Sequence, residues 1–223
     1  MVKGVIFDLD GTLIDTIEGL ANSVNAAMEF YSFPNHSIEA YRTFVGNGVG
    51  KLVQRALPQD SKHLCEDARK IFEKHYAETM LNILPVYEGI DELLAYLRAK
   101  NIKIAVNTNK MDIFAKPMIK KVFGDIFTDV LGEVEFFSRK PSPDGANYLL
   151  EKMQIKNDEC LYVGDSHVDI KTAHNAGMKC VSVTWGFMSK EDLLNNNPDI
   201  LVDNPHEIID LIERENLYAG QYS

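Results

Sequence analysis

The hydrophobic residues of this chain fall into short runs that alternate with helical patterns. Six runs have the character of strands: Gly4–Phe7, Ile102–Asn107, Asp129–Leu131, Cys160–Val163, Cys180–Thr184 and Ile200–Val202. Most of them are apolar at consecutive positions, which is typical of strands buried on both faces of a parallel sheet. Segments with helical spacing separate them, such as the stripe of Ile90, Leu93, Leu94 and Leu97. The pattern predicts an α/β fold in which helices flank a parallel sheet.

Short polar motifs mark where several helices should begin and end. Ser142-Pro143-Asp144 combines a capping residue, a proline at the first helical position and an acid facing the positive helix end, and Asn204-Pro205-His206-Glu207 repeats that order. Gly177 should end the helix that follows Ser166. Pro117 has no amide hydrogen for a helix interior, so we expect a kink or a late start in the helix over 112–122.

The connection after the first strand is much longer than the others. About seventy residues separate that strand from the helix near Asp91, whereas connections in α/β units usually have about 2–6 residues. Two helical stripes occupy this stretch: Ile17, Leu20, Ala21, Val24, Ala27, Met28 and Tyr31, and Leu64, Ala68, Ile71, Phe72 and His75. We therefore predict a helical cap domain over residues 15–86, inserted into a Rossmann-like core made of residues 1–14 and 87–223.

Composition and charge narrow the class of protein. The chain has 223 residues, of which 45% are hydrophobic and 25% charged, with a net charge of −10. An excess of acids opposes the phosphate neutralisation on which nucleic-acid binding depends, and no apolar run approaches the roughly 20 residues of a membrane span. Three scattered cysteines favour free thiols in a reducing compartment. We expect a cytoplasmic protein, monomer or homodimer, that binds neither nucleic acid nor membranes.

Two carboxylates leave the end of the first strand together. Asp8 and Asp10 are two residues apart, and alternate residues of a strand point to the same side. Such a pair suits chemistry in which one ionised carboxylate is the nucleophile and its neighbour exchanges protons. An Asp-Gly turn after a strand is also common in proteins without such chemistry, so the pair needs support from other segments.

Three later segments supply that support. Asn107-Thr108-Asn109-Lys110 places a hydroxyl and backbone amides at a strand-to-helix turn, where they suit an oxyanion. Lys140 lies between Arg139 and Pro141, just before a predicted helix. Gly164-Asp165-Ser166-His167-Val168-Asp169 ends a strand with two acids. Asp169 can be the partner of Ser166 in a capping box, whereas Asp165 stands at the strand edge where α/β proteins bind ligands.

The four segments together predict a magnesium and phosphoryl site. Asp8, Asp165 and a backbone carbonyl near Asp10 are hard oxygen ligands that suit Mg²⁺. Lys140 and Thr108 add positive charge and hydrogen bonds around a phosphoryl group, whose transfer depends mainly on positioning and electrostatics.

The order of these motifs resembles the haloacid-dehalogenase superfamily of phosphotransferases, and the insertion is similar to that superfamily's helical cap. The resemblance covers the whole chain. It implies that Asp8 is a nucleophile that forms an aspartyl-phosphate, and that Asp10 protonates the leaving oxygen and then activates water. It also implies that Thr108, with Asn109, binds phosphoryl oxygens and that Lys140 neutralises charge. The metal set would be Asp8, Asp10, Asp165 and Asp169, with Asp169 acting from behind the direct ligands.

The cap sequence resembles more narrowly that of phosphoglycolate phosphatases, over residues 41–57, as does the stretch over 185–203. Gly46 and Gly48 precede a helix, where exposed backbone amides can meet a small carboxylate. Lys51 and Arg55 would add positive charge there. A flexible turn with two solvated cations explains the same residues equally well.

We therefore expect a Mg²⁺-dependent phosphatase of small phosphorylated metabolites, with 2-phosphoglycolate as the first candidate. Asp10 favours phosphoester chemistry because a halide needs no proton donor. The alternatives within the superfamily are a pyrophosphatase, a sugar-phosphate or nucleotide phosphatase, and a β-phosphoglucomutase-type isomerase. A catalytically silent binding module on the same fold is the alternative of another class.

Overall fold

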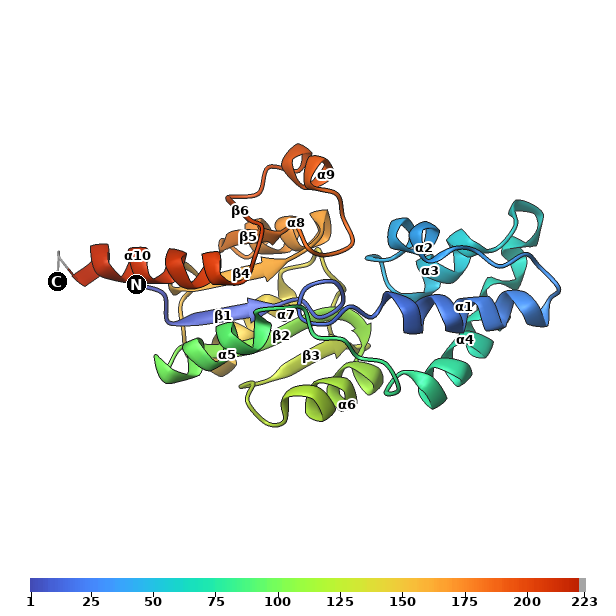
Figure 1. The fold of residues 1–223 in the computed structure, drawn as a ribbon, viewed down its shortest axis with the longest axis horizontal. Helices are drawn as coiled ribbons and strands as arrows, with labels where there is room; N and C mark the ends of the chain where they lie inside the picture. Colours follow the sequence, from blue (N-terminus) through green and yellow to red (C-terminus); the bar gives the residue numbers. More distant parts are fainter. Residues whose placement is uncertain (221–223) are drawn as a thin grey trace.

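In the computed structural model, which describes residues 1–220, a parallel sheet forms the centre of the larger lobe (Figure 1). Its strands within those residues are β1 (Gly4–Phe7), β2 (Lys103–Met111), β3 (Val130–Glu133), β4 (Cys160–Gly164), β5 (Lys179–Val183) and β6 (Ile200–Val202). They pair in the order β3-β2-β1-β4-β5-β6, and every pairing is parallel. The α/β fold class predicted from the sequence is confirmed.

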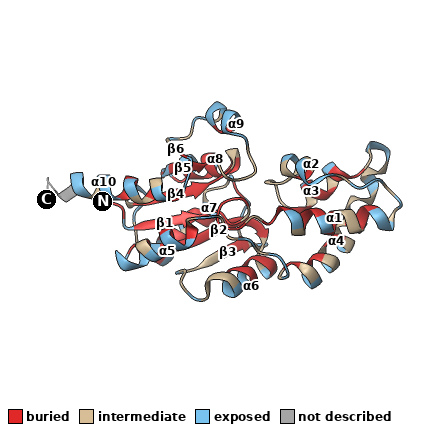
Figure 2. Ribbon diagram, viewed as in Figure 1, coloured by how far each residue is buried: buried red, intermediate tan, exposed pale blue. Residues whose placement is uncertain are grey.

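Helices cover both faces of the sheet. They are α5 (Ile90–Ala99), α6 (Asp112–Phe123), α7 (Asp144–Met153), α8 (His167–Asn175), α9 (Lys190–Asn195) and α10 (His206–Gly220), with a short 3₁₀ turn, η2, at Asn157–Glu159. Val5 and Phe7 of β1 share a core with residues of α5, α6 and α10, whereas Ile6 shares a core with residues of α7 and α8. Successive residues of the central strand thus point to opposite, equally buried layers, which appear in red in Figure 2.

The end of β2 differs from the sequence prediction. The strand continues to Met111 instead of stopping near Asn107, and its pairing with β3 is irregular between those two residues. Thr108, Asn109 and Lys110 lie in this added part and are buried although they are polar. Polar residues hide a strand from a hydrophobic pattern, and here they turn out to belong to the candidate site.

The predicted helix ends are largely confirmed. Asn204 Oδ1 accepts hydrogen bonds from the amides of His206 and Glu207, at 3.1 and 3.3 Å, and Gly177, with φ +67°, follows the end of α8. Helix α7 begins at Asp144, one residue later than Pro143, and the Ser142 hydroxyl accepts the Asp144 amide at 3.4 Å.

Of the two effects expected from Pro117, the late start is wrong, and the kink stays a prediction. Helix α6 begins at Asp112 and contains Pro117. The first four amides of a helix have no partner within it. Pro117 comes soon after them, so it costs the helix one hydrogen bond rather than a whole turn.

The second lobe is the helical insertion (Figure 1). It contains α1 (Ile17–Phe30), α2 (Ile38–Phe44), α3 (Val49–Ala56), the 3₁₀ turn η1 (Gln59–Leu64) and α4 (Cys65–Thr79). These helices bury a core of their own, which Phe114 and Met118 of α6 extend into the sheet lobe. We call this lobe the helical cap.

Two neighbouring segments join the helical cap to the core. Ile14 and Val86 form an isolated antiparallel bridge, and the Asp15 amide donates to the Pro85 carbonyl at 2.9 Å. These contacts lie where the sequence places the boundary between cap and core. The division into a cap of residues 15–86 and a core of residues 1–14 and 87–223 stays a proposal. Residues 221–223 of that core lie outside the described chain. No helix within residues 1–220 is both long enough and apolar enough to cross a membrane.

Candidate active site

The carboxyl ends of β1, β2 and β4 face the helical cap (Figure 1). A cavity of about 360 Å³ is lined by residues from these strand ends and from the cap. Several polar side chains at this edge are buried, namely those of Asp8, Thr108, Asn109, Lys110, Lys140, Asp165 and Asp169. Burying so many polar groups is costly unless they pair with one another or with a ligand. Their partners therefore show how the site is organised.

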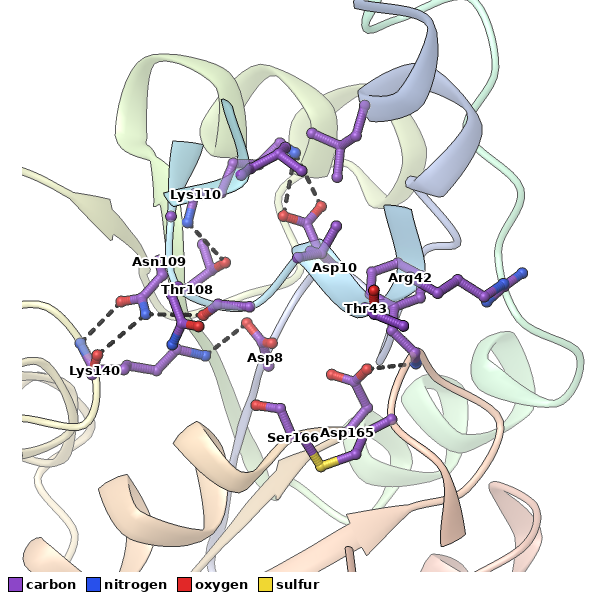
Figure 3. A pocket seen from close by; sticks show the side chains of 18 of the residues that line it. Asp8, Asp10, Arg42, Thr43, Thr108, Asn109, Lys110, Lys140, Asp165 and Ser166 are labelled. Atoms are coloured by element: carbon purple, nitrogen blue, oxygen red, sulfur yellow. Dashed lines mark hydrogen bonds and ion pairs between the residues drawn. The ribbon is translucent and has the colours of Figure 1, made fainter. Parts of the chain in front are cut away.

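Lys140 is the cationic centre of the site. Its ammonium nitrogen lies 2.8 Å from Asp8 Oδ1 and 2.7 Å from Asp169 Oδ1. Burial by itself would lower the pKa of Lys140, but Asp169 and Asp8 outweigh burial and raise that pKa well above its ordinary value. Lys140 therefore carries a positive charge at the point where Asp8 leaves the sheet (Figure 3).

Three carboxylates form a cluster beside this cation. Asp8, Asp165 and Asp169 each offer an oxygen, and these oxygens lie within 4.8 Å of one another. Burial, the largest cause, raises the pKa of Asp8 to about 7, and burial with the charges of Asp169 and Asp8 raises the pKa of Asp165 well above its ordinary value. Like charges held this close repel each other, so a divalent cation would relieve a strain that Lys140 relieves only in part.

Two carboxylates of the cluster, those of Asp8 and Asp165, suit a metal ion. Within the described chain, Asp8 Oδ1 is buried without a hydrogen bond, although it forms the ion pair with Lys140. Asp165 Oδ1 receives only a long hydrogen bond, 3.5 Å, from the Thr12 hydroxyl. Carboxylate oxygens of this kind are the ligands that Mg²⁺ prefers. Asp8 and Asp165 are therefore the side chains that could hold the ion directly.

Asp169 is placed differently from these two ligands. Its Oδ1 accepts from Lys140, and its Oδ2 accepts from the Ser166 amide at 3.1 Å and from the Ser166 hydroxyl. The capping box considered in the sequence is thus present, together with the ion pair. Because both oxygens are already engaged, Asp169 holds Lys140 and the start of α8 in place.

The loop after β5 encloses Asp165. The Phe187 amide donates to Asp165 Oδ2 at 2.7 Å, and the Trp185 indole N–H donates to the Thr12 carbonyl at 3.1 Å. A Cβ added at Gly186 would lie 2.3 Å from Asp165 Cβ, and one added at Gly11 would lie 2.3 Å from Asp165 Oδ2. Only residues without a side chain fit this close approach. No sequence pattern indicated a role for this loop at Asp165.

Asp10 points away from the acidic cluster. Its carboxylate accepts from the Thr16 hydroxyl at 2.6 Å and from Lys110 at 2.9 and 3.2 Å. Only its backbone carbonyl therefore remains for the metal role that the sequence suggested. Lys110 was not among the predicted site residues, because nothing in the sequence indicates that its partner lies 100 positions earlier.

Thr108 and Asn109 lie within the last part of β2, whereas the sequence placed them in a strand-to-helix turn after Asn107. The Thr108 hydroxyl oxygen accepts the Lys110 amide at 3.2 Å, which leaves its proton for another acceptor. The Asn109 side chain accepts the Lys140 amide at 2.9 Å and donates to the carbonyls of Lys140 and Gly46, at 3.2 and 3.4 Å. Asn109 is thus a link between the lysine loop and the helical cap.

The predicted residues of the cap separate into two groups. Gly46, Gly48 and Arg55 line the cavity. Arg55 donates to the Phe44 carbonyl and to Asn47 Oδ1, both at 2.7 Å, and so braces the glycine turn. Lys51 is exposed, donates to the Gln54 side chain and is not among the described residues that line the cavity.

Two further cavity residues escaped the sequence prediction. Arg42 of the cap lies 3.5 Å from Asp15 and 5.7 Å from the ring centre of Phe187. His167, which the sequence favours as a surface or packing residue, also lines the cavity, and burial lowers its pKa. The position of Arg42 depends on how the cap packs over the sheet, which no local pattern encodes, whereas His167 is the first residue of α8.

Comparison with known proteins agrees with this geometry. The family model for haloacid dehalogenase-like hydrolases matches residues 5–183. A phosphoglycolate phosphatase from Vibrio parahaemolyticus is 35% identical over 219 residues, which cover 95% of this chain and 96% of that protein. A solved structure of a predicted phosphoglycolate phosphatase from Haemophilus somnus has a TM-score of 0.85 at 30% identity, covering 95% of this chain and 98% of that one. A second solved structure, of a predicted phosphoglycolate phosphatase from Lactobacillus delbrueckii subsp. bulgaricus, has a TM-score of 0.88 at 28% identity. The match covers 94% of this chain and 98% of that one. The chain belongs to the haloacid dehalogenase-like hydrolase family.

Proposed function

We propose that the protein is a Mg²⁺-dependent phosphatase that hydrolyses small phosphomonoesters, with 2-phosphoglycolate as the first candidate substrate. The observation that carries the proposal is the separation of two carboxylates that are neighbours in sequence. Asp8 faces Lys140 and the acidic cluster, whereas Asp10 faces Thr16 and Lys110. This arrangement supports Asp8 as the group that attacks phosphorus and Asp10 as the group that transfers the proton. The names of the relatives support the substrate class.

In the first half of the proposed reaction, an oxygen of Asp8 attacks phosphorus while the ester bond to the leaving oxygen breaks. Asp10 gives its proton to that oxygen, so that an alcohol departs. The phosphoryl group is then covalently bound to Asp8. Lys140 and the Thr108 hydroxyl lie where they can stabilise the oxygens around phosphorus.

In the second half, water attacks the phosphoryl group on Asp8 and gives a proton to Asp10. The bond between Asp8 and phosphorus breaks, phosphate leaves, and both carboxyl groups return to their starting states. Mg²⁺ would be held by Asp8, Asp165 and the Asp10 carbonyl, and it would neutralise charge on the phosphoryl oxygens. Asp169 contributes by fixing Lys140.

The substrate's second anionic group would meet the helical cap. The turn at Gly46 and Gly48 leads into α3, whose first amides have no helical partner. Arg55 and Arg42 supply positive charge along the same wall of the cavity. These groups suit a carboxylate at short range from the phosphoryl site, which is the arrangement of atoms in 2-phosphoglycolate.

A kinetic screen tests the proposal. Purified protein is assayed with p-nitrophenyl phosphate and with a panel that includes phosphoglycolate, sugar phosphates, nucleotides and pyrophosphate, each with and without a chelator. We expect chelator-sensitive release of phosphate and the highest kcat/KM for phosphoglycolate. Isomerised sugar phosphate without net phosphate release would instead identify a mutase. Absence of turnover with every compound would identify a binding module and refute the proposal.

The remaining parts of this proposal concern setting and assembly. We propose that the enzyme acts in the cytoplasm as a monomer or homodimer, with residues 15–86 as the cap and residues 1–14 and 87–223 as the catalytic core. Closure of the cap would exclude bulk water from the aspartyl-phosphate.

A further inference from the structure

Lys110 is a buried cation that no step of the proposed reaction uses. Its side chain is 2% exposed, and its ammonium nitrogen lies 2.9 Å from Asp10 Oδ1 and 3.2 Å from Asp10 Oδ2. The ring centre of Tyr76, from α4 of the helical cap, is 4.8 Å from the same nitrogen. Lys110 thus contacts the proposed proton carrier on one side and the cap on the other.

The surroundings of Lys110 keep it charged. Burial by itself would lower its pKa, but the carboxylate of Asp10, together with Tyr76, outweighs burial and raises the pKa above its ordinary value. A buried ion pair is seldom more stabilising than apolar side chains of the same volume. Phe114 and Tyr76, whose ring centres are 5.3 Å apart, already provide an apolar contact between cap and core in this region. Stability alone is therefore a weak reason for a lysine at this position.

The contacts of Lys110 fix the orientation of Asp10. The Thr16 hydroxyl binds only Oδ1, and a carboxylate held at one oxygen can still rotate. Lys110 contacts both oxygens, which defines the plane of the carboxylate beside the cavity (Figure 3). A group that transfers a proton must lie within hydrogen-bond distance of its target, so orientation affects the rate directly.

We propose that Lys110 is a positioning residue, which holds the carboxyl group of Asp10 toward the leaving oxygen under the cover of Tyr76. This inference rests on the proposed function, because it presumes that Asp10 transfers the proton. Because Tyr76 belongs to α4, the orientation of Asp10 also depends on the packing of the cap against α6. In this proposal, Lys110 acts through Asp10 and not on the phosphoryl group.

Leaving-group dependence distinguishes positioning from a general structural effect. In Lys110→Met, kcat/KM is measured for p-nitrophenyl phosphate and for an alkyl phosphate such as phosphoglycolate. An alkoxide needs a proton to leave and an aryl oxide hardly does, so we expect a loss of about 10-fold or more for the alkyl ester and about 2-fold or less for the aryl ester. Lys116→Met, which removes an exposed lysine paired with Asp112 on α6, is the matched control and should change neither value.

A second background tests whether Lys110 acts through Asp10. In Asp10→Asn, where the carboxylate is absent, adding Lys110→Met should lower kcat/KM for the alkyl ester by no more than about 2-fold, because residues that act as a unit are non-additive. Lys110→Gln keeps a hydrogen-bond donor and should recover part of the loss. If Lys110→Met is poorly folded, the kcat/KM values of the alkyl and aryl esters are compared in Lys110→Gln instead.

Several outcomes would overturn the inference. Equal losses on both esters would show a structural role, and an undiminished loss in the Asp10→Asn background would show that Lys110 acts on the substrate itself. A higher KM for phosphoglycolate with unchanged kcat would identify Lys110 as a carboxylate-binding residue. Any of these results leaves the phosphatase proposal intact. A wild-type protein without turnover would overturn both the phosphatase proposal and the positioning role of Lys110.

Discussion

Replacing Asp8 with Asn should give a protein that is inactive and yet more stable than the wild type when no divalent cation is present. Asn has nearly the size of Asp but cannot attack phosphorus, so turnover should be lost. The gain in stability has a different origin, because the variant removes a charge that burial disfavours. Asp8 lies in a cluster whose carboxylates repel one another and are only partly compensated by Lys140.

The size of the stabilisation follows from the pKa of Asp8. Burial raises that pKa from its ordinary value of 3.8 to about 7. The folded protein therefore binds a proton between about pH 4 and pH 7 that the unfolded chain has released, so this group's contribution to stability falls as the pH rises through that window. Above pH 7 the full penalty of about 4 kcal/mol is present. Asn brings an amide group close to Lys140, so we expect a smaller net gain, about 1–3 kcal/mol at pH 8.

Thermal unfolding in EDTA measures the effect. A gain of about 1–3 kcal/mol corresponds to a rise in Tm of about 2–12 °C for a chain of this size. The rise should be largest at pH 8 and should shrink toward pH 4, where the wild-type carboxyl is protonated. Asp60→Asn, on the exposed turn η1, is the matched control and should leave Tm unchanged. A lower Tm for Asp8→Asn than for the wild type at pH 8 would refute the account of strain at the acidic cluster. Residual turnover in Asp8→Asn would refute Asp8 as the nucleophile.

Three further predictions concern the metal, the acid and the cap. Asp165→Ala should raise the Mg²⁺ concentration needed for activity. Ca²⁺ should inhibit the wild-type protein because it favours more and longer oxygen bonds than Mg²⁺ does. Equal turnover with Ca²⁺ and with Mg²⁺ would contradict the metal assignment. Asp10→Asn should lower kcat/KM about 10²-fold or more for alkyl phosphates and less for p-nitrophenyl phosphate, and equal losses would argue against general acid catalysis. Arg55→Met should lower kcat/KM for phosphoglycolate about 10-fold more than for p-nitrophenyl phosphate, with Lys51→Met as the matched control. A similar loss in that control would show that both cations serve the substrate.

Much of the fold follows from local patterns in the sequence. Strands buried on both faces leave apolar runs, and the pattern placed β1 and β6 at the residues that the structure shows. The long helical insertion was visible for the same reason, since α1 and α4 each bury a stripe at helical spacing. These features depend on residues close in sequence, which is why periodicity is enough to find them.

The candidate site was predictable only where its residues carry a motif. Asp8, Lys140 and Asp165 follow strands in a recognisable order, and the structure places their side chains together. Lys110 and Arg42 were missed because their contacts come from distant parts of the chain: Asp10 for one, and Asp15 with Phe187 for the other. Such pairings depend on which strands lie side by side and on how the cap packs against the sheet, and a single sequence has no pattern for either.

The loop after β5 has a consequence for the order in which the protein can become functional. Asp8 is near the beginning of the chain, yet the Phe187 amide and the Trp185 indole complete the surroundings of Asp165 from near its end. A ribosome-bound chain that stops before this loop can form the pairing of β1 with β4 but lacks the donor that fixes Asp165 Oδ2. The full set of contacts around Asp165 is thus complete only after the loop that follows β5 has been synthesised.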